Sequence, residues 1–365
     1  MPAPDATFIR QTSQTSIQVG LESAHNVLHS MMLLNKVHEL SGYSQWVVDT
    51  AVSLTPQQAS NNVLVLEGLH YAVHPYQSWS SFPAYLDHLA MQDPVILRDN
   101  ILNIYVMLPS QTGQESITVN QPTDIIATLG TYLDYLQSRF TADCVDAQIE
   151  TQAYALLKDP LAMQQFIVTH LRELWLDYFA DEWSRAKPML QEAVTAFSQL
   201  GLEQLTPLEA ARKVIGQEVP DRWREIIAEH TYERIVFVPS AHLGPYLGTL
   251  RDFHNLYLLF GARLPEGTAT QSPDLNRSEL LMRLGALSDD TRLQILQLIG
   301  DAGQLCSKEI MMQLNLSQSA TSRHLTQLTA SGYLDEQWRD GTKCYSLNKT
   351  RIKCTLSAVE QFLLD

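Results

Sequence analysis

The fold of this chain is decided by the stretch "LSQSATSRHLTQLTASGYLDEQWRDGTKCYSL", residues 316–347. Its first half predicts a helix from Gln318 to about Ala330, because Ser317 is a favourable N-cap and Gly332 a favourable stop. We expect the inward side of this helix to be apolar and the outer side polar. Inward are Ala320, Leu325 and Leu328; outward are Gln318, Ser319, Thr321, Ser322, Arg323 and His324.

The second half of the stretch predicts a β-hairpin. Two alternating runs, "YLDEQW" and "KCYSL", flank Asp340-Gly341, a residue pair that tight hairpin turns favour. Arg339 and Lys343 lie on either side of this turn, so the tip of the hairpin is basic.

The residues upstream predict three further helices. Leu280, Leu284 and Leu287 share one apolar stripe, and Ser288 is expected to cap a second helix with acidic residues in its first turn. A short third helix, Ser307 to Leu314, is joined to the polar-faced helix by a tight turn. This order is typical of a helix-turn-helix, and the hairpin that follows makes it a winged helix.

The charge distribution supports this interpretation, although a net charge of −15 is unfavourable for binding nucleic acid. Residues 1–274 carry 15 Lys/Arg and 30 Asp/Glu, whereas residues 275–365 carry ten of each. Between Arg339 and Lys353 there are five basic residues and a single acidic one. The hairpin and the segment after it therefore form a local positive patch on an acidic chain.

The motifs "ALSDDTRLQILQLI" and "CSKEIMMQLNLSQSATSRHLTQLTASGYLDEQWRDGTKCYSL" resemble the ArsR-type winged-helix repressors of bacteria, over about 75 residues. The resemblance implies a homodimer that forms through the first and last helices of the module, and a recognition helix that enters the major groove of an operator. By position it carries over these DNA-contacting residues: Ser317, Gln318, Ser319, Thr321, Ser322, Arg323 and His324, with Arg339 and Lys343 from the wing.

The four cysteines, at 144, 306, 344 and 354, are unevenly spaced, predict no disulfide framework and suit a reducing cytoplasm. Metal-sensing relatives carry a Cys-x-Cys pair where this chain has Cys306 followed by Lys308. The last helix, "TRIKCTLSAVEQFLLD", has no histidine, so Cys354 could serve a metal only together with Cys306 across a dimer. We therefore expect no metal site in this module.

We expect a mainly α protein, in which an N-terminal helical domain with a small β element precedes the C-terminal winged helix-turn-helix. Residues 1–16 are expected to be a flexible lead-in, residues 17–262 the helical domain, residues 263–277 a linker and residues 278–365 the winged helix. Prolines 56, 94, 122, 160 and 207 mark expected helix starts. "ERIVFVPS" (233–240) and "HNLYLLFGA" (254–262) predict the strands.

Other chemistry in the N-terminal domain is weakly indicated. The pairs His25/His29 and His70/His74 have a helical spacing that zinc sites use, but buried or surface histidines are the commoner reason for it. Ser240 stands too near His242 in sequence to form a catalytic triad. Trp175, Tyr178 and Trp183 could line an apolar pocket, although aromatic residues more often belong to the core. We expect neither a catalytic residue nor a cofactor.

The sequence thus predicts a cytoplasmic DNA-binding repressor without a membrane segment. A non-metal signal, from a small-molecule or protein effector, would enter through the N-terminal domain. The alternative is an enzyme or protein-binding module in that domain, with the winged helix as a tether or protein-contact domain.

Overall fold

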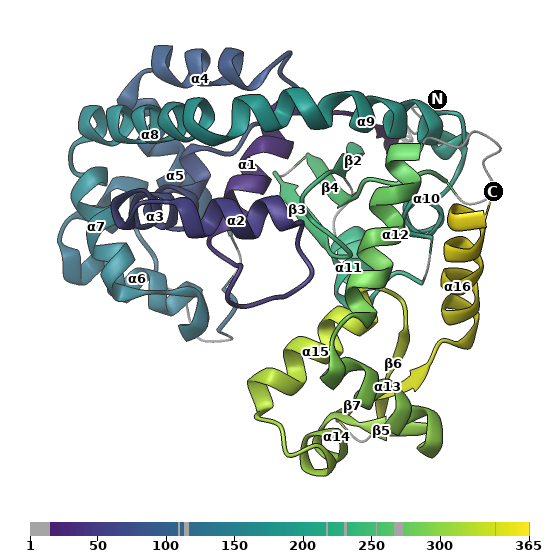
Figure 1. Ribbon diagram of the computed structural model, residues 1–365. Coiled ribbons are helices and arrows are strands. Elements are labelled where there is room, and N and C mark those ends of the chain that lie inside the picture. Colours follow the sequence, from purple (N-terminus) through teal and green to yellow (C-terminus); the bar gives the residue numbers. More distant parts are fainter. Residues whose placement is uncertain are drawn as a thin grey trace, which may run out of the picture.

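The computed structural model describes residues 15–108, 110–112, 117–216, 218–229, 232–252, 254–265, 273–339 and 341–364. A large N-terminal domain of helices around one sheet is followed by a smaller C-terminal module (Figure 1). The expected fold class is confirmed: the chain is mainly α, with a β element in the first part and a winged helix-turn-helix in the second.

The N-terminal sheet has the strand order β1-β2-β4-β3. The central strands β2 (Arg234–Ser240) and β4 (Asn255–Gly261) are parallel, and β3 (Leu247–Arg251) runs antiparallel to β4. At the other edge, β1 (Ser16–Val19) pairs in parallel with β2, in the register Ser16 to Arg234. Strands β1 and β2 are neighbours in the sheet but far apart in the sequence. Residues 20–233 between them therefore form one long insertion.

Helices occupy that insertion, and their starts follow the prolines predicted from the sequence. Thr55 and Thr206 form capping boxes ahead of Pro56 and Pro207, and aspartates cap the helices that begin at Pro94 and Pro160. The helices are α1 (Ser23–Leu34), α2 (Gln45–Ser53), α3 (Pro56–Val63), α4 (Phe82–Met91), α5 (Pro94–Met107), α6 (Leu129–Arg139), α7 (Ala147–Leu157), α8 (Pro160–Leu174), α9 (Ala180–Ser198), α10 (Pro207–Ile215) and α11 (Asp221–Glu229). Shorter turns lie at Leu64–Gly68, His70–Ala72, Pro122–Ile126, Ala142–Cys144, Trp175–Phe179 and Leu202–Gln204.

The sheet is buried on both faces, which explains why its strands read as continuous apolar runs rather than alternating ones. Val236 and Val238 of β2 face the core shared with helices α1 to α8. Ile235 and Phe237, which alternate with them, face a second core with α10 and the end of α9. The β element is therefore the central layer between two layers of helices.

Three expected boundaries differ from the structure. Residues 1–14 of the expected lead-in lie outside the described residues, and Ser16 already begins β1. Within the expected linker, residues 266–272 lie outside the described residues, and a helix begins at Pro273. Asp289, and not Ser288, caps the second helix of the C-terminal module, because its carboxylate accepts the backbone N–H of Arg292.

The C-terminal module follows the predicted order. It contains α12 (Pro273–Leu287), α13 (Asp290–Ala302), β5 (Gln304–Cys306), α14 (Ser307–Gln313), α15 (Gln318–Ala330), β6 (Leu334–Arg339), β7 (Thr342–Leu347) and α16 (Lys349–Leu364). Its strands form a separate sheet in the order β5-β7-β6. Ile295, Ile299, Leu325 and Leu328 lie in its core, as the apolar spacing predicts.

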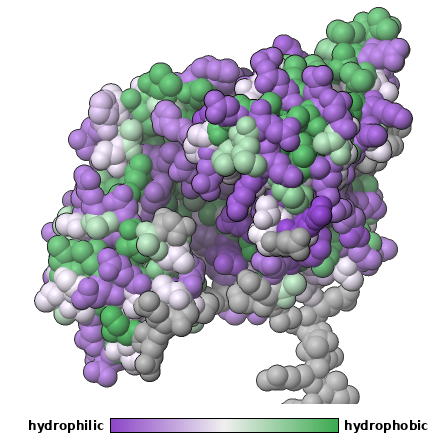
Figure 2. All heavy atoms as spheres, turned by 90° about the horizontal axis from the view of Figure 1, so that it is seen from below, coloured by the Kyte–Doolittle hydropathy of each residue, from purple (hydrophilic) through white to green (hydrophobic). Residues whose placement is uncertain are grey.

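Within the described ranges, no helix has the length and apolar character needed to cross a bilayer. On the face seen in Figure 2, hydrophilic side chains predominate and apolar ones gather in separate patches.

Five of the described histidines of the N-terminal domain are buried: His25, His29, His74, His170 and His242. Desolvation lowers the pKa of His25 to about 3, and those of His29, His70, His74 and His170 to about 4. His25 is stacked on Tyr257, and its Nε2 lies 2.9 Å from the carbonyl oxygen of Pro75. These imidazoles are packed against neighbouring side chains. The His25/His29 and His70/His74 spacings are therefore explained by packing.

We predict that the N-terminal domain loses stability as the pH falls from about 6.5 towards 4. The unfolded chain binds protons at these histidines near pH 6.5 whereas the folded chain does not, so each can cost about 2 kcal/mol at pH 5. Burial raises the pKa of Glu150 to about 7, which works in the opposite direction, but this is one group against five histidines. Urea unfolding followed by tryptophan fluorescence at several pH values measures the effect. Equal midpoints at pH 7.5 and 5 would contradict it.

Candidate nucleic-acid interface

The recognition helix α15 begins where the sequence predicts. The hydroxyl of Ser317 accepts the N–H of Ala320 at 3.2 Å, and Asn315, with φ of 49°, makes the turn between α14 and α15. Five of the predicted contact residues are exposed at the start of this helix: Ser317, Gln318, Ser319, Ser322 and Arg323. Hydroxyl, amide and guanidinium groups of this kind bind base edges and phosphates.

Two predicted contact residues lie elsewhere. Thr321 is 3% exposed and donates its hydroxyl to the carbonyl of Ser317, and His324 is 9% exposed. The ring of His324 points towards α13, where its Nδ1 lies 3.8 Å from Asp289. Our expectation that both side chains face outward is wrong, because helical spacing places them beside the buried Leu325 and Leu328.

The wing has the predicted turn, in which Gly341 has φ of +71°. Arg339 is exposed beside it. Lys343 forms an ion pair of 2.7 Å with Glu336 and lies 5.4 Å from the ring centre of Trp338. Trp338 is 59% exposed, and the sequence analysis did not single it out. An exposed tryptophan beside a basic turn offers a flat apolar surface next to positive charges.

A buried arginine joins the first two helices of the module. The guanidinium of Arg292 donates to the carbonyl oxygens of Ala286 (2.6 Å) and Gly285 (2.9 Å), and lies 3.7 Å from the carboxylate of Asp289. Arg292 thereby satisfies the free carbonyls at the end of α12. Sequence reasoning recognised this arginine only as part of a motif, since burial is not visible in one sequence.

The cysteines differ from the expectation that no disulfide forms. Cys306 and Cys344 are bonded to each other, and they face each other in the antiparallel pairing of β5 with β7. Cys344 is fully buried, whereas Cys306 is partly exposed. Cys144 and Cys354 are free thiols at exposed positions. The pairing was missed because residues 307–343 separate the two cysteines.

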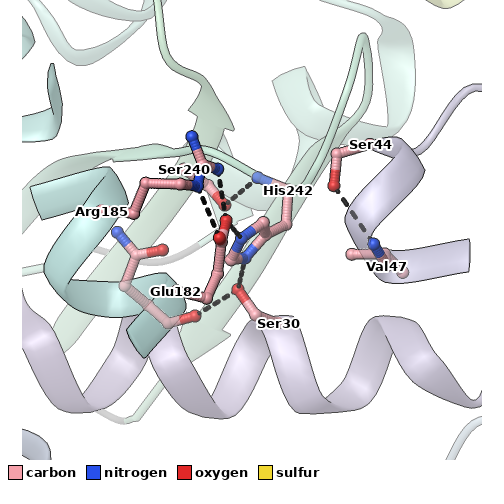
Figure 3. A network of polar contacts seen from close by, with 8 residues as sticks. Ser30, Ser44, Val47, Glu182, Arg185, Ser240 and His242 are labelled. Carbon is pink, nitrogen blue, oxygen red and sulfur yellow. Dashed lines mark hydrogen bonds and ion pairs between the residues drawn. The ribbon is translucent and has the colours of Figure 1, made fainter. Parts of the chain in front are cut away.

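A buried polar network lies in the N-terminal domain (Figure 3). The ring of His242 has Ser30 Oγ 2.8 Å from Nδ1 and Glu182 Oε1 2.8 Å from Nε2, and Arg185 pairs with the same carboxylate. The hydroxyl of Ser240 accepts the backbone N–H of His242 at 3.4 Å and does not bond the ring. The serine at the ring, Ser30, is 1% exposed and also lies 2.9 Å from the carbonyl of Asn26. The network resembles a triad in composition, but its buried hydroxyl offers no access to a substrate.

The Ser30–Glu182–His242 network continues towards the recognition helix. Trp46 is stacked on the ring of His242, and the His242 carbonyl accepts the N–H of Ser44 at 3.2 Å. In the same loop, the hydroxyl of Ser41 donates to the side-chain oxygen of Gln327 at 2.6 Å. Gln327 belongs to α15 and is 3% exposed. The N-terminal domain therefore contacts the recognition helix directly.

Trp175, Tyr178 and Trp183 pack partly buried against the N-terminal core. This placement agrees with the more common role of aromatic residues, which is to pack in the core. No cluster of three or more metal-ligating side chains occurs among the residues that the structure describes.

Comparison with known proteins places relatives on the C-terminal module. Residues 289–336 match the family model described as bacterial regulatory protein, arsR family. The chain is 38% identical over 87 residues to the arsenic resistance transcriptional regulator ArsR2 of Pseudomonas putida, covering 22% of this chain and 76% of that one. It is 31% identical over 91 residues to the transcriptional activator HlyU of Vibrio cholerae, covering 25% and 83%.

Among solved structures, reduced HlyU from Vibrio cholerae is 29% identical, and the match covers 25% of this chain and 96% of that one. Its TM-score of 0.21 is too low to support an argument about the fold. Each of these matches spans a quarter of this chain or less.

We predict that Arg292→Ala destabilises the C-terminal module by about 1–3 kcal/mol, because the carbonyl oxygen of the buried Ala286 loses its donor, whereas that of Gly285 keeps the Ser288 hydroxyl. Arg323→Ala is the matched control: it removes an exposed arginine from the same module, and the expected change is within about 0.5 kcal/mol. Hydrogen–deuterium exchange of α12 and α13, combined with urea unfolding, measures both. If the two variants exchange equally slowly, Arg292 does not join these helices.

Proposed function

Because the chain belongs to the arsR family of bacterial regulatory proteins, whose members bind DNA and regulate transcription, we propose that it is a repressor controlled through its N-terminal domain. The observation that carries this proposal is the exposed polar start of α15, between residues 317 and 323, beside a basic wing. The start of α15 and the wing belong to the same module. The helix can therefore enter the major groove while the wing lies along the phosphate backbone.

The residues proposed to contact DNA are those of the predicted set whose side chains are accessible to solvent, together with Trp338. They are Ser317, Gln318, Ser319, Ser322 and Arg323 of the recognition helix, with Arg339, Lys343 and Trp338 of the wing. Thr321 and His324 support the helix from inside. An operator in double-stranded DNA is the partner, and a protein that binds it acts in the bacterial cytoplasm.

We predict that Ser322→Ala with Arg323→Ala lowers affinity for operator DNA about tenfold, since a lost base or phosphate contact costs about 1–3 kcal/mol. Lys343→Ala should weaken binding to all sequences and reduce the salt slope by about one. Gel shift and footprinting on the region upstream of its own operon measure both. Arg172→Ala is the control, because this half-exposed arginine pairs with Asp87 in the N-terminal domain. Unchanged binding by the double variant would exclude the proposed interface.

We also propose that the regulator is a homodimer that forms through α12 and α16. Leu356, Phe362, Leu363 and Leu364 of α16 are between 49% and 77% exposed, and Leu281 of α12 is 60% exposed. The two helices contact each other, with the hydroxyls of Tyr333 and Thr355 3.1 Å apart beneath them. An apolar face of this kind is typical of an association surface.

We predict that Leu363→Glu converts the dimer into a monomer, because a carboxylate would be buried against apolar side chains. Leu161→Glu is the matched control, since Leu161 is 55% exposed on α8 of the N-terminal domain. Light scattering after size-exclusion chromatography distinguishes the two masses. A wild-type monomer, or a dimer that persists in the Leu363→Glu variant, would contradict the proposal.

The N-terminal domain is the proposed entry point of the signal, which would come from a small-molecule or protein effector and not from a metal. The hydrogen bond between Ser41 and Gln327 supports this route, because it connects that domain to the helix that enters the groove. An effector that shifts the loop around Ser41 would change how α15 is held.

A further inference from the structure

We propose that Cys306 and Cys344 form a reversible thiol–disulfide site, which reacts with small or protein thiols and with peroxides, and which controls how the wing is held against the helix-turn-helix. The bond itself is present in the structure. The effect on DNA affinity rests on the proposed function above, whereas the redox chemistry does not.

The bond links two parts that both face DNA. Cys306 ends β5 and is the N-cap residue of α14, the first helix of the helix-turn-helix. Its backbone N–H donates to the carboxylate of Glu309 at 2.7 Å, which fixes it to the first turn of that helix. Cys344 lies on β7, directly after the wing residue Lys343. With the bond closed, wing and helix pair move as one unit.

The closed loop encloses the whole reading surface. Residues 307–343, between the two cysteines, contain α14, the turn, α15 and the strand β6. Without the bond, β5 holds β7 only through the three paired positions from Gln304 to Cys306. So short a pairing at a sheet edge is easily opened, and the wing gains freedom that DNA binding must then remove.

Exposure indicates which sulfur reacts. Cys306 is partly exposed, so an external thiolate can reach its sulfur, whereas Cys344 is fully buried behind it. In the reduced protein Cys344 is a small apolar residue that suits its position. The disulfide thus has one sulfur in a partly exposed residue, Cys306, and one in Cys344, which suits the core as a reduced thiol.

The cellular setting favours reversibility. A regulator that binds bacterial DNA works among reducing thiols, where the disulfides of proteins are mostly transient and catalytic or redox-sensing. The two remaining cysteines, Cys144 and Cys354, are exposed and unpaired. Among the described residues, Cys306 and Cys344 are therefore the pair that the fold places for thiol–disulfide exchange.

A thiol RSH is the reductant that opens the disulfide between Cys306 and Cys344. A thiolate RS⁻ attacks the sulfur of Cys306, the bond to Cys344 breaks, and the released Cys344 thiolate takes up a proton. A second RSH then reduces the mixed disulfide, releasing RSSR and the Cys306 thiol. In the reverse direction, hydrogen peroxide takes two electrons and two protons from the dithiol, giving the disulfide and two molecules of water.

The test uses the full chain in a Cys144→Ser/Cys354→Ser background, so that only this pair reports. The native protein is equilibrated in mixtures of reduced and oxidised glutathione, quenched with an alkylating agent and weighed by mass spectrometry. We expect millimolar reduced glutathione to open the bond without denaturant, and glutathione disulfide or hydrogen peroxide to close it again. In gel shifts, the reduced form should bind operator DNA at least about threefold more weakly, because the wing is no longer preorganised.

A variant with Cys306→Ser and Cys344→Ala should bind like the reduced form and ignore both reagents. Thiols that never pair in the folded protein, or a bond that opens only after unfolding, would overturn the redox site. Equal DNA affinity of the two forms would overturn its control of the wing. If neither form prefers operator DNA, the proposed function fails, while the alkylation result still decides the redox site.

Discussion

The arrangement of the whole molecule depends on the way a loop of the N-terminal domain holds the recognition helix. The amide of Gln327, on the inner side of α15, is buried between its own module and residues Ser41 and Gly42. A polar side chain at such a position is costly unless it is bonded, and the Ser41 hydroxyl supplies the bond. A residue of the N-terminal domain thus supplies the bonding partner of a buried side chain on the recognition helix.

The loop that makes this contact is itself tightly held. Gly42 has φ of +101°, and a Cβ there would lie 2.7 Å from the amide nitrogen of Gln327. Gly244 has φ of +63°, and a Cβ there would lie 2.0 Å from the Gly42 carbonyl oxygen, so the two loops pack backbone against backbone. Two residues before Gly244, His242 belongs to the buried network with Glu182 and Ser30. A shift in the N-terminal core therefore has a short physical route to α15.

The sequence predicted those parts of the fold that depend on interactions between residues close together in the chain. The caps, stripes and turn of the winged helix act over a few residues, so Ser317 and the hairpin at Gly341 were found at their places. The pairing of β1 with β2 crosses residues 20–233, and the bond from Cys306 to Cys344 crosses a helix-turn-helix. No local pattern marks such partners.

The candidate site was predicted in outline for the same reason. Polarity along α15 identified its exposed start, but it could not separate Arg323, which faces solvent, from Thr321, which is buried. The N-terminal network joins Ser30 of α1, Glu182 of α9 and His242, which follows β2. Only the folded sheet brings these together, so sequence spacing gave no sign of them.

A double-mutant cycle on operator affinity tests most directly whether the N-terminal domain holds the recognition helix. Ser41→Ala, Gln327→Ala and the pair are compared with wild type, with Ser184→Ala on α9 as control. The account predicts that both single variants change affinity at least about threefold in the same direction, and that the pair changes it no further. Unchanged affinity in Ser41→Ala, or effects that simply add, would contradict it.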